Sequence, residues 1–246
     1  MAAEVFATEG LSVPVHEIAR RAGVGTEIGG ALARLAVDAG LNVVLSNSRS
    51  PETLAGLVAE LGSRARAATP SEAAAAADWV VVAVPLKHQS QIPVAPLAGK
   101  VVLDATNYYP ERDGSIAELD DEKVTTSELL QRHLTGSEVV KAFNNIWVKH
   151  LASLARPAGA PDRSVLPIAG DTPDAKAAAT RLIDLLGYDT LDTGPLADSW
   201  CFQRDTPAYV KLYFKDQREL TEEDPGGTVT AGELRAALAA ARRQNA

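Results

Sequence analysis

The chain has 246 residues, a net charge of -8, a sequence pI near 5.1 and a mean hydropathy of -0.04, and 46% of its residues are hydrophobic. This composition indicates an ordinary globular protein with one core and an appendage, and its negative charge disfavours general nucleic-acid binding. The sequence has no apolar run of the roughly 18 residues that span a bilayer, and no signal peptide pattern at its start. A single cysteine, Cys201, excludes an internal disulfide and suits a cytoplasmic protein.

Strands and helices alternate along the first part of the chain. The first predicted helix carries apolar residues at Ile28, Leu32, Leu35 and Ala39 and ends at Gly40, a residue suited to the position after a helix. Capping boxes predict helices over 70–77 and 125–134, and another helix is expected to begin at residue 51. We expect strands at 41–46, 64–68, 79–84, 101–103 and 138–142. The alternation predicts an α/β fold with a doubly wound parallel sheet, a Rossmann-like NAD(P)-binding fold.

The spacing changes after about residue 146, which predicts a small α/β extension. We expect strands at 164–169 and 188–191, a helix over 172–186, a mostly helical stretch over 199–220 and a terminal helix over 232–243 after a linker. The predicted organisation is an N-terminal segment (1–26), a nucleotide-binding domain (27–146), an acceptor-side portion (147–220), and a linker with the terminal helix (221–246).

The turn after the strand at 41–46 carries the clearest chemical signal. It follows a glycine-containing turn by about 20 residues, which is where a dinucleotide-binding unit meets the adenine ribose. A carboxylate there favours NAD, but this chain has Asn47, Ser48 and Arg49. A guanidinium with two further donors suits a 2′-phosphate. A solvated loop arginine is the alternative for Arg49 taken alone, but its context favours NADP(H).

Three further loops follow strands at the edge where such sheets bind ligands. They contain residues 84–87, 104–107 and 142–145, and they are placed to line the nicotinamide half of the cofactor. Taken singly, Pro85 also fits simple strand termination and Asn107 a turn, whereas their joint spacing favours the cofactor. Histidines are scattered and only one cysteine is present, so the sequence predicts no metal site.

Over about residues 27–211 the chain resembles the F420-dependent NADP reductase family. The matching stretches are Ile28-Gly29-Gly30-Ala31-Leu32-Ala33, Ser46-Asn47-Ser48-Arg49, Ala83-Val84-Pro85, Asp104-Ala105-Thr106-Asn107, Lys141-Ala142-Phe143-Asn144 and Gly194-Pro195-Leu196-Ala197-Asp198-Ser199. The resemblance implies an enzyme that transfers hydride between NADP(H) and the deazaflavin coenzyme F420. It also implies a homodimer with a small-molecule redox partner, and neither a nucleic-acid nor a membrane partner.

The resemblance assigns roles to particular residues. Asn47, Ser48 and Arg49 would hold the 2′-phosphate, Val84 and Pro85 would touch the nicotinamide half, and Asn144 with Ser199, Trp200 and Cys201 would border the acceptor. The full set of cofactor-binding candidates is Gly25, Thr26, Glu27, Ile28, Gly29, Asn47, Ser48, Arg49, Val84, Pro85, Lys87, Asn107, Ala142 and Asn144. No general base is assigned, because hydride passes directly between two stacked rings.

The N-terminus departs from the family pattern. An apolar strand running into Gly-x-Gly-x-x-Gly is expected, but Val24 and Thr26 stand where the first two glycines belong before Gly29. Residues 1–26 instead resemble a truncated tetracycline-repressor-type helix-turn-helix without its recognition helix. Either residues 11–18 act as a poor substitute strand, in which Pro14 removes a hydrogen-bond donor, or the sheet has a gap beside its second and fourth strands. In both cases we expect weakened dinucleotide binding. Two alternatives stay open: another flavin or a small carbonyl as acceptor, and a non-catalytic dinucleotide-binding regulator.

Overall fold

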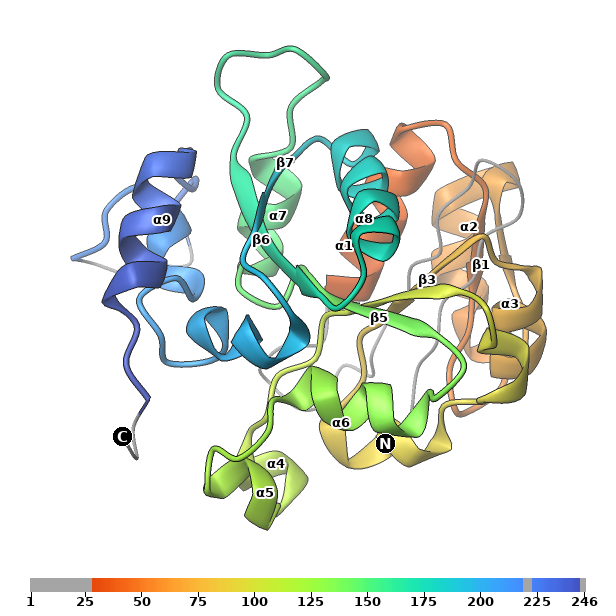
Figure 1. The fold of residues 1–246 in the computed structure, drawn as a ribbon. Helices are drawn as coiled ribbons and strands as arrows, with labels where there is room; N and C mark the ends of the chain where they lie inside the picture. The colour runs from red at the N-terminus through yellow and green to blue at the C-terminus, as the bar shows by residue number, and fades with distance from the viewer. Residues whose placement is uncertain (1–27, 219–222, 244–246) are drawn as a thin grey trace.

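A computed structural model describes residues 28–218 and 223–243, with a five-stranded sheet through their centre (Figure 1). Across the sheet the strands are β3 (Trp79–Val82), β4 (Val101–Asp104), β5 (Glu138–Lys141), β6 (Val165–Gly170) and β7 (Asp189–Asp192). A second, two-stranded parallel sheet pairs β1 (Val43–Leu45) with β2 (Ala65–Ala67). Strands β3, β4 and β5 are parallel and alternate with helices, which confirms the predicted α/β fold.

The helices lie on both sides of the five-stranded sheet. They are α1 (Ile28–Asp38), α2 (Ala55–Leu61), α3 (Pro70–Ala76), α4 (Pro110–Asp113), α5 (Ala117–Asp120), α6 (Thr126–His133), α7 (Val148–Ser153), α8 (Pro173–Leu185) and α9 (Ala231–Ala240). Six 3₁₀ helices join them: η1 (Pro51–Leu54), η2 (Gly62–Arg64), η3 (Leu86–Gln91), η4 (Ala95–Leu97), η5 (Leu196–Phe202) and η6 (Val210–Tyr213). In Figure 1, α8 and α6 lie on opposite faces of the sheet.

Alternate residues of each central strand enter two different hydrophobic cores. Val81, Leu103 and Val140 pack in a core with residues of α1 and α8. Val80 and Val102 pack in the other core, with residues of α3 and α6. Successive side chains of a strand point to opposite faces, so a strand covered on both faces must be apolar throughout. This explains the continuous valine run that predicted β3.

Within the described residues, no strand joins the β1–β2 pair to β3. Strands β1 and β3 correspond to the second and fourth strands of the expected order, and the region where the first strand is expected lies outside the described residues. All three residues of β1 are nevertheless buried. The segment 11–18, considered as a substitute strand, lies outside the described residues, as does the repressor-like stretch.

Local signals located most helix ends correctly. Gly40 has a φ of 83°, and the capping boxes Thr69–Glu72 and Thr125–Glu128 are both formed. The prediction of a mostly helical stretch over 199–220 was wrong, since its described part holds only η6 and the end of η5. Asp205 has a positive φ of 68°, which interrupts a right-handed helix, and Val210 at the start of η6 has a φ of 41°.

Strand β6 runs antiparallel to β5, a direction that the sequence did not reveal. Between them the chain forms only α7, which packs against α1 and does not cross back over the sheet. Strand β7 then pairs in parallel with β6, after α8 has made the crossover. The extension therefore continues the same sheet.

A buried ion pair joins the ends of β4 and β5. Asp104 and Lys141 are partners in the strand register, and their side chains are 0% and 1% exposed. Lys141 Nζ lies 3.1 Å from Asp104 Oδ2, and also donates to Thr126 Oγ1 at 2.9 Å and to the carbonyl oxygen of Thr106. Asp104 accepts from the Thr106 amide at 2.9 Å and from Ser127 Oγ at 2.6 Å. Both charges therefore have several partners, which a buried pair requires.

Replacing Lys141 by methionine should destabilise the fold by about 3–5 kcal/mol, because the Asp104 carboxylate would remain buried without its counter-charge. Denaturant unfolding monitored by circular dichroism measures this loss. The control is Arg132→Ala, which removes a half-exposed pair with Glu118 and should cost at most about 1 kcal/mol. Equal losses in the two variants would contradict the structural role of the buried pair.

Candidate functional site

A cavity of about 390 Å³ lies where the carboxyl ends of β3, β4 and β5 meet. It is lined by the start of α1, by the three strand-end loops, and by two segments that follow them, 109–112 and 209–210. Parallel strands bring their carboxyl ends to one edge, which is why residues far apart in sequence meet here. Of the predicted cofactor-binding residues, the cavity brings together Ile28, Val84, Asn107 and Asn144.

Two asparagines hold the floor of the cavity. Asn107 Nδ2 donates to the carbonyl oxygen of Asn144 at 2.7 Å, and Asn144 Nδ2 lies 3.2 Å from Asn107 Oδ1 and 3.0 Å from the carbonyl oxygen of Phe202. Asn144 Oδ1 and Thr106 Oγ1 are buried and have no hydrogen-bond partner among the described residues. Buried polar atoms are normally satisfied, so these two are suited to a ligand with hydrogen-bonding groups.

Backbone strain occurs at the same place. Phe143 is fully buried with a φ of 61°, and Val210 has a φ of 41°, a conformation that is costly for a β-branched residue. The Val210 amide donates to the carbonyl oxygen of Asn145 at 2.7 Å. Asn145 Nδ2 in turn donates to the carbonyl oxygen of Ala208 at 3.0 Å. These bonds fasten the segment around residue 210 to the end of β5.

The predicted phosphate-binding turn follows β1. Asn47 is 2% exposed, and both ends of its amide are used within the turn: Oδ1 accepts from the Arg49 amide at 3.0 Å and Nδ2 donates to Thr53 Oγ1 at 2.8 Å. Ser48 and Arg49 are exposed. The structure therefore makes Asn47 the residue that shapes the turn, and leaves Ser48 and Arg49 on its surface.

Other predicted residues lie beside the cavity without lining it. Lys87 donates from Nζ to the carbonyl oxygen of Arg112 at 2.8 Å, which ties η3 to α4. Pro85 and Ala142 are buried. Gly29 is buried in the first turn of α1. Gly25, Thr26 and Glu27 lie outside the described residues.

The acceptor-side segment is divided by the structure. Trp200 lines a second cavity, of about 260 Å³, whereas Asn144 lines the first. Ser199 is 2% exposed, and Cys201 Sγ donates to the carbonyl oxygen of Asp198 at 2.9 Å. Burial raises the pKa of the Cys201 thiol to about 11, so it stays protonated at neutral pH. Only Trp200 of this segment therefore reaches a cavity.

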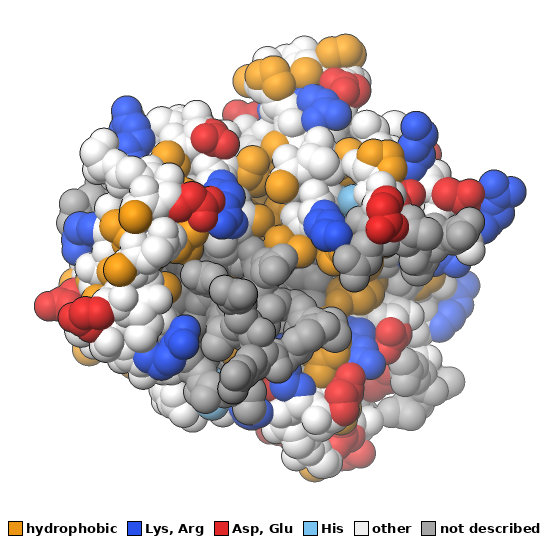
Figure 2. Space-filling view, turned by 180° about the vertical axis from the view of Figure 1, so that it is seen from behind, with side chains coloured by type: hydrophobic (Ala, Val, Ile, Leu, Met, Phe, Trp, Pro, Cys, Tyr) orange, Lys and Arg blue, Asp and Glu red, His pale blue; other side chains and the backbone are white. Residues whose placement is uncertain are grey.

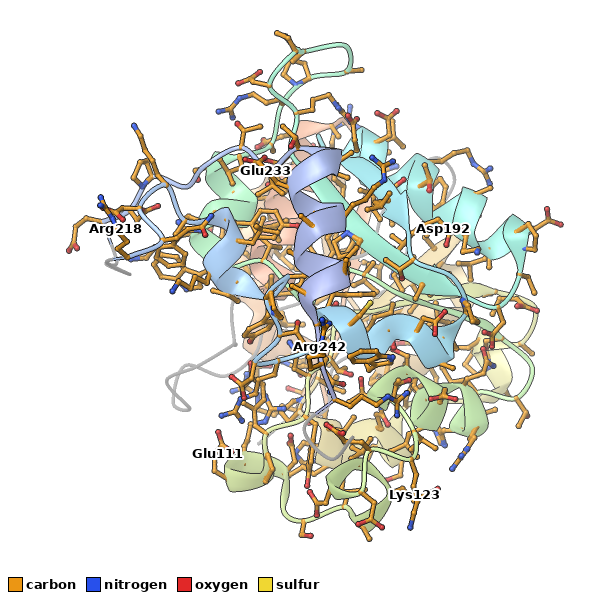
Figure 3. All side chains as sticks on the ribbon, turned by 60° about the vertical axis from the view of Figure 1, so that its left-hand side comes forward. Glu111, Lys123, Asp192, Arg218, Glu233 and Arg242 are labelled. Carbon is orange, nitrogen blue, oxygen red and sulfur yellow. The ribbon has the colours of Figure 1, made fainter. Side chains whose placement is uncertain are left out.

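The second cavity lies between η5, the α4–α5 segment and the end of α9. In Figure 3 the end of α9, marked by Arg242, faces the segment that carries Glu111 and Lys123. The Arg243 guanidinium lies 5.1 Å from the centre of the Trp200 ring and donates to the carbonyl oxygen of Glu122 at 2.6 Å. The terminal helix is therefore fastened to the body of the protein.

Sequence reasoning missed the polar wall of the first cavity. Tyr109 and Tyr209 both line it, and their hydroxyl oxygens are 2.6 Å apart. Arg112 also lines it and donates to the carbonyl oxygen of Asn107 at 2.9 Å. The signal for Tyr109 was present, since two tyrosines directly follow Asn107 at the end of a strand-end loop. No local pattern marks Tyr209.

An aromatic cluster supports another wall. Trp147 lines the cavity and stacks on Phe214 with ring centres 5.6 Å apart and planes at 11°. The buried His150 ring packs edge-on against both, and its Nε2 donates to the carbonyl oxygen of Asp224 at 3.2 Å. Burial lowers the pKa of His150 below 6.5, so the ring is neutral at neutral pH.

In the described part of the chain, no group of three His, Cys, Asp or Glu side chains is arranged to hold a metal ion. No helix there is long and apolar enough to cross a membrane.

Comparisons with known proteins point to one family. Residues 23–108 match the family model described as NADP oxidoreductase coenzyme F420-dependent. The F420-dependent NADP reductase of Methanothermobacter thermautotrophicus is 29% identical over 222 residues, which cover 84% of this chain and 93% of that protein. The resemblance inferred from the sequence is thereby confirmed.

Solved structures show the same fold. A hypothetical protein from Sinorhizobium meliloti is 28% identical with a TM-score of 0.67, covering 80% of this chain and 91% of its own. A putative F420-dependent NADP-reductase from Arthrobacter sp. is 23% identical with a TM-score of 0.61, covering 77% of this chain and 87% of its own.

The His150 ring should make the fold less stable in mild acid. Its pKa is lowered in the folded state, so the unfolded state takes up the proton first as the pH falls through 6.5, and stability falls with it. His150→Gln, which keeps a side-chain N–H donor, should show a smaller loss between about pH 8 and about pH 5. Chemical unfolding at several pH values measures both proteins. Parallel losses would show that His150 does not contribute.

Proposed function

We propose that this chain is an NADP(H)-dependent oxidoreductase that transfers hydride between NADP(H) and a deazaflavin coenzyme of the F420 type. The observation that carries the proposal is the cavity at the ends of β3, β4 and β5, with the buried, unpartnered atoms Thr106 Oγ1 and Asn144 Oδ1. It lies at the ligand-binding edge of an α/β sheet, in a chain that resembles the F420-dependent NADP reductases.

The adenine end of NADP(H) would be held by the turn after β1. Arg49 carries a fixed positive charge on an exposed side chain, and Ser48 beside it is also exposed. Asn47 holds the turn in shape through its bond to the Arg49 amide. A guanidinium makes charge-assisted hydrogen bonds to a phosphate, and no carboxylate stands in this turn to repel one. The first turn of α1, with Ile28 and Gly29, would offer amide groups to the pyrophosphate.

The nicotinamide end would lie in the cavity. Val84 and Ala83 form an apolar wall, while Asn107 and Asn144 form the polar floor. The nicotinamide carboxamide has both a donor and an acceptor, which complement Asn144 Oδ1 and Thr106 Oγ1. When bound, NADPH supplies a hydride from its dihydropyridine ring. The protein's contribution is to orient the two rings and to exclude water.

The acceptor would approach from the side of Tyr109 and Asn144 in the first cavity. Ser199 and Cys201 are engaged within η5 and Trp200 lines the second cavity, so we assign contact with the acceptor to Asn144. The family resemblance extends the proposal to a homodimer in the cytoplasm with a small-molecule redox partner. In the view from behind, Lys and Arg side chains alternate with Asp and Glu over the described surface (Figure 2). Such mixed charge gives no support to a nucleic-acid partner.

We further propose that nucleotide binding is weaker than in a relative with an intact first strand. The sequence is the ground for this: Val24 and Thr26 stand where the first two glycines belong, and the turn after the first strand normally gives amide donors to the pyrophosphate. An apolar strand with a Gly-x-Gly turn engineered in place of residues 11–25 should tighten NADPH binding. Equal affinity of the two proteins for NADPH, measured by titration calorimetry, would contradict this part of the proposal.

Arg49→Ala should weaken NADPH binding by about 10- to 100-fold, because a charged hydrogen bond contributes about 1.5–3 kcal/mol. NADH affinity should not change, since NADH lacks the 2′-phosphate. Isothermal titration with both nucleotides measures the effect. Arg181→Ala, which removes an exposed arginine of α8, is the charge-matched control and should bind NADPH as the wild type does. An equal loss for NADPH and NADH in Arg49→Ala would remove the 2′-phosphate role.

The purified chain should oxidise NADPH when oxidised F420 is added, with loss of the deazaflavin absorbance. Flavin mononucleotide and a small aldehyde serve as alternative acceptors in parallel assays. Turnover only with F420 supports the proposal, whereas turnover only with another acceptor reassigns the substrate. NADPH binding without turnover of any acceptor would favour a dinucleotide-sensing protein over an enzyme.

A further inference from the structure

The first cavity has a polar wall that the proposed cofactor contacts do not use. Tyr109 follows the β4 loop and Tyr209 precedes η6, so residues a hundred positions apart meet there. Their hydroxyl oxygens are 2.6 Å apart, and neither hydroxyl has another hydrogen-bond partner among the described residues. In such a pair one hydroxyl donates to the other, and the second O–H remains available to donate elsewhere. The pair therefore holds one proton that no other described residue engages.

Two guanidinium groups lie over the aromatic ring of Tyr109. Arg112 and Arg204 lie over its ring, 4.7 Å and 4.5 Å from the ring centre. Arg112 is fixed by Asp113 at 2.8 Å, and Arg204 by Glu111 at 2.8 Å. A cation over an aromatic face withdraws electron density from the ring and stabilises negative charge developing on its oxygen. The two guanidinium groups are therefore placed to stabilise a tyrosinate formed at Tyr109.

The Tyr209 hydroxyl, in contrast, is in a position that favours keeping its proton. Burial raises the pKa of its hydroxyl well above the ordinary tyrosine value, so it keeps its proton at neutral pH. Either hydroxyl can donate within the pair, and in the arrangement in which Tyr209 donates to Tyr109 Oη the Tyr109 proton is free for an acceptor. The division of roles follows from the positions of the two rings, since both arginines lie over the Tyr109 ring.

The cavity offers no other titratable oxygen or imidazole. Among its described lining residues, the titratable groups are Tyr109, Tyr209 and Arg112, and Arg112 is held by its bonds to Asp113 and to the Asn107 carbonyl. Thr106 and the two asparagines can hydrogen-bond but do not exchange a proton at neutral pH. Among the described residues, the tyrosine pair is therefore the group placed to deliver a proton within this cavity.

We propose that Tyr109 is a catalytic residue that donates the proton balancing hydride transfer, with Tyr209 as its hydrogen-bond donor. The inference rests on the proposed function and defines the class of acceptor. The acceptor must have the carbon that receives the hydride conjugated to a nitrogen or oxygen that gains the electron pair. An F420-type deazaflavin ring, a carbonyl and an imine all meet this requirement, whereas an isolated carbon–carbon double bond does not.

The step balances in atoms and electrons. The C4–H bond of the dihydronicotinamide breaks with its electron pair, NADPH becomes NADP⁺, and a C–H bond forms on the acceptor carbon. The displaced π pair moves to the conjugated nitrogen or oxygen, which takes the proton of Tyr109. The tyrosinate oxygen accepts the Tyr209 hydrogen bond and regains a proton from water, while the two guanidinium groups lie over its ring.

The test compares Tyr109→Phe, Tyr209→Phe and the control Tyr108→Phe. Tyr108 is the adjacent tyrosine, but its hydroxyl is engaged by Asp120 Oδ1 at 2.7 Å and by the Ile116 amide at 3.0 Å. Turnover of NADPH with oxidised F420 gives kcat and KM, and fluorescence titration gives the Kd of NADPH. Equilibrium dialysis of oxidised F420 without NADPH reports the acceptor contact independently of turnover.

Tyr109→Phe should lower kcat by about 100-fold or more, the effect of losing a positioned acid, while the Kd of NADPH changes by less than about threefold. F420 should bind about 2- to 10-fold more weakly, as for the loss of one hydrogen bond. Tyr209→Phe should show a smaller fall in kcat, and Tyr108→Phe none. The wild-type kcat should fall in deuterium oxide. The ratio of kcat in ordinary water to kcat in deuterium oxide should differ between the wild type and Tyr109→Phe.

Several results would overturn the inference. If Tyr109→Phe keeps both the wild-type kcat and the F420 affinity, the hydroxyl has no role although the proposed function stands. If Tyr109→Phe and Tyr108→Phe lose NADPH affinity and kcat together, the tyrosines are structural. If the wild type binds NADPH but reduces no acceptor, the proposed function fails and the proton-donor role fails with it.

Discussion

The buried pair of Asp104 and Lys141 is the constraint on which the site depends. It couples the last residues of β4 and β5, and its hydrogen bonds reach both the amide and the carbonyl oxygen of Thr106. A buried charge pair contributes little net stability but fixes one arrangement, because every alternative leaves a charge unpaired. The loop from Thr106 to Tyr109 therefore leaves the sheet in a single direction, and the cavity takes its shape from that direction.

The layout of the fold explains why the cavity combines apolar and polar walls. Helices cover both faces of the central strands, so apart from the paired Asp104 and Lys141 their buried residues are apolar. Alanine and valine follow the end of β3, while polar residues such as Asn107 and Asn144 line the cavity where the backbone has left the sheet. The positive φ values at Phe143 and Val210 are the conformational cost of bringing these segments together.

Much of the fold could be predicted from the sequence, because its signals are local. Capping boxes, a continuous valine strand and the glycine after α1 each depend on a few neighbouring residues, and all are confirmed. The direction of β6 and the irregular path of 203–209 were not predictable. They depend on the packing of α7 against α1 and on contacts such as Tyr109–Tyr209, which join residues far apart in sequence.

The residues of the candidate cavity could be predicted where they directly follow a strand, but not where tertiary packing brings them to the cavity. Val84, Asn107 and Asn144 were found because strand-end position is a local property, and the structure brings them into one cavity. Arg112 and Tyr209 were missed because their place at the cavity follows from tertiary packing. Trp200 was expected beside Asn144 but lines the second cavity instead.

The most direct test of direct hydride transfer between NADPH and a deazaflavin uses NADPH carrying deuterium at C4. After reaction with oxidised F420 in ordinary water, mass spectrometry locates the label. The account predicts that deuterium from one face of C4 appears on the deazaflavin product. Deuterium released to water, or an unlabelled product formed while NADPH is consumed, would contradict it.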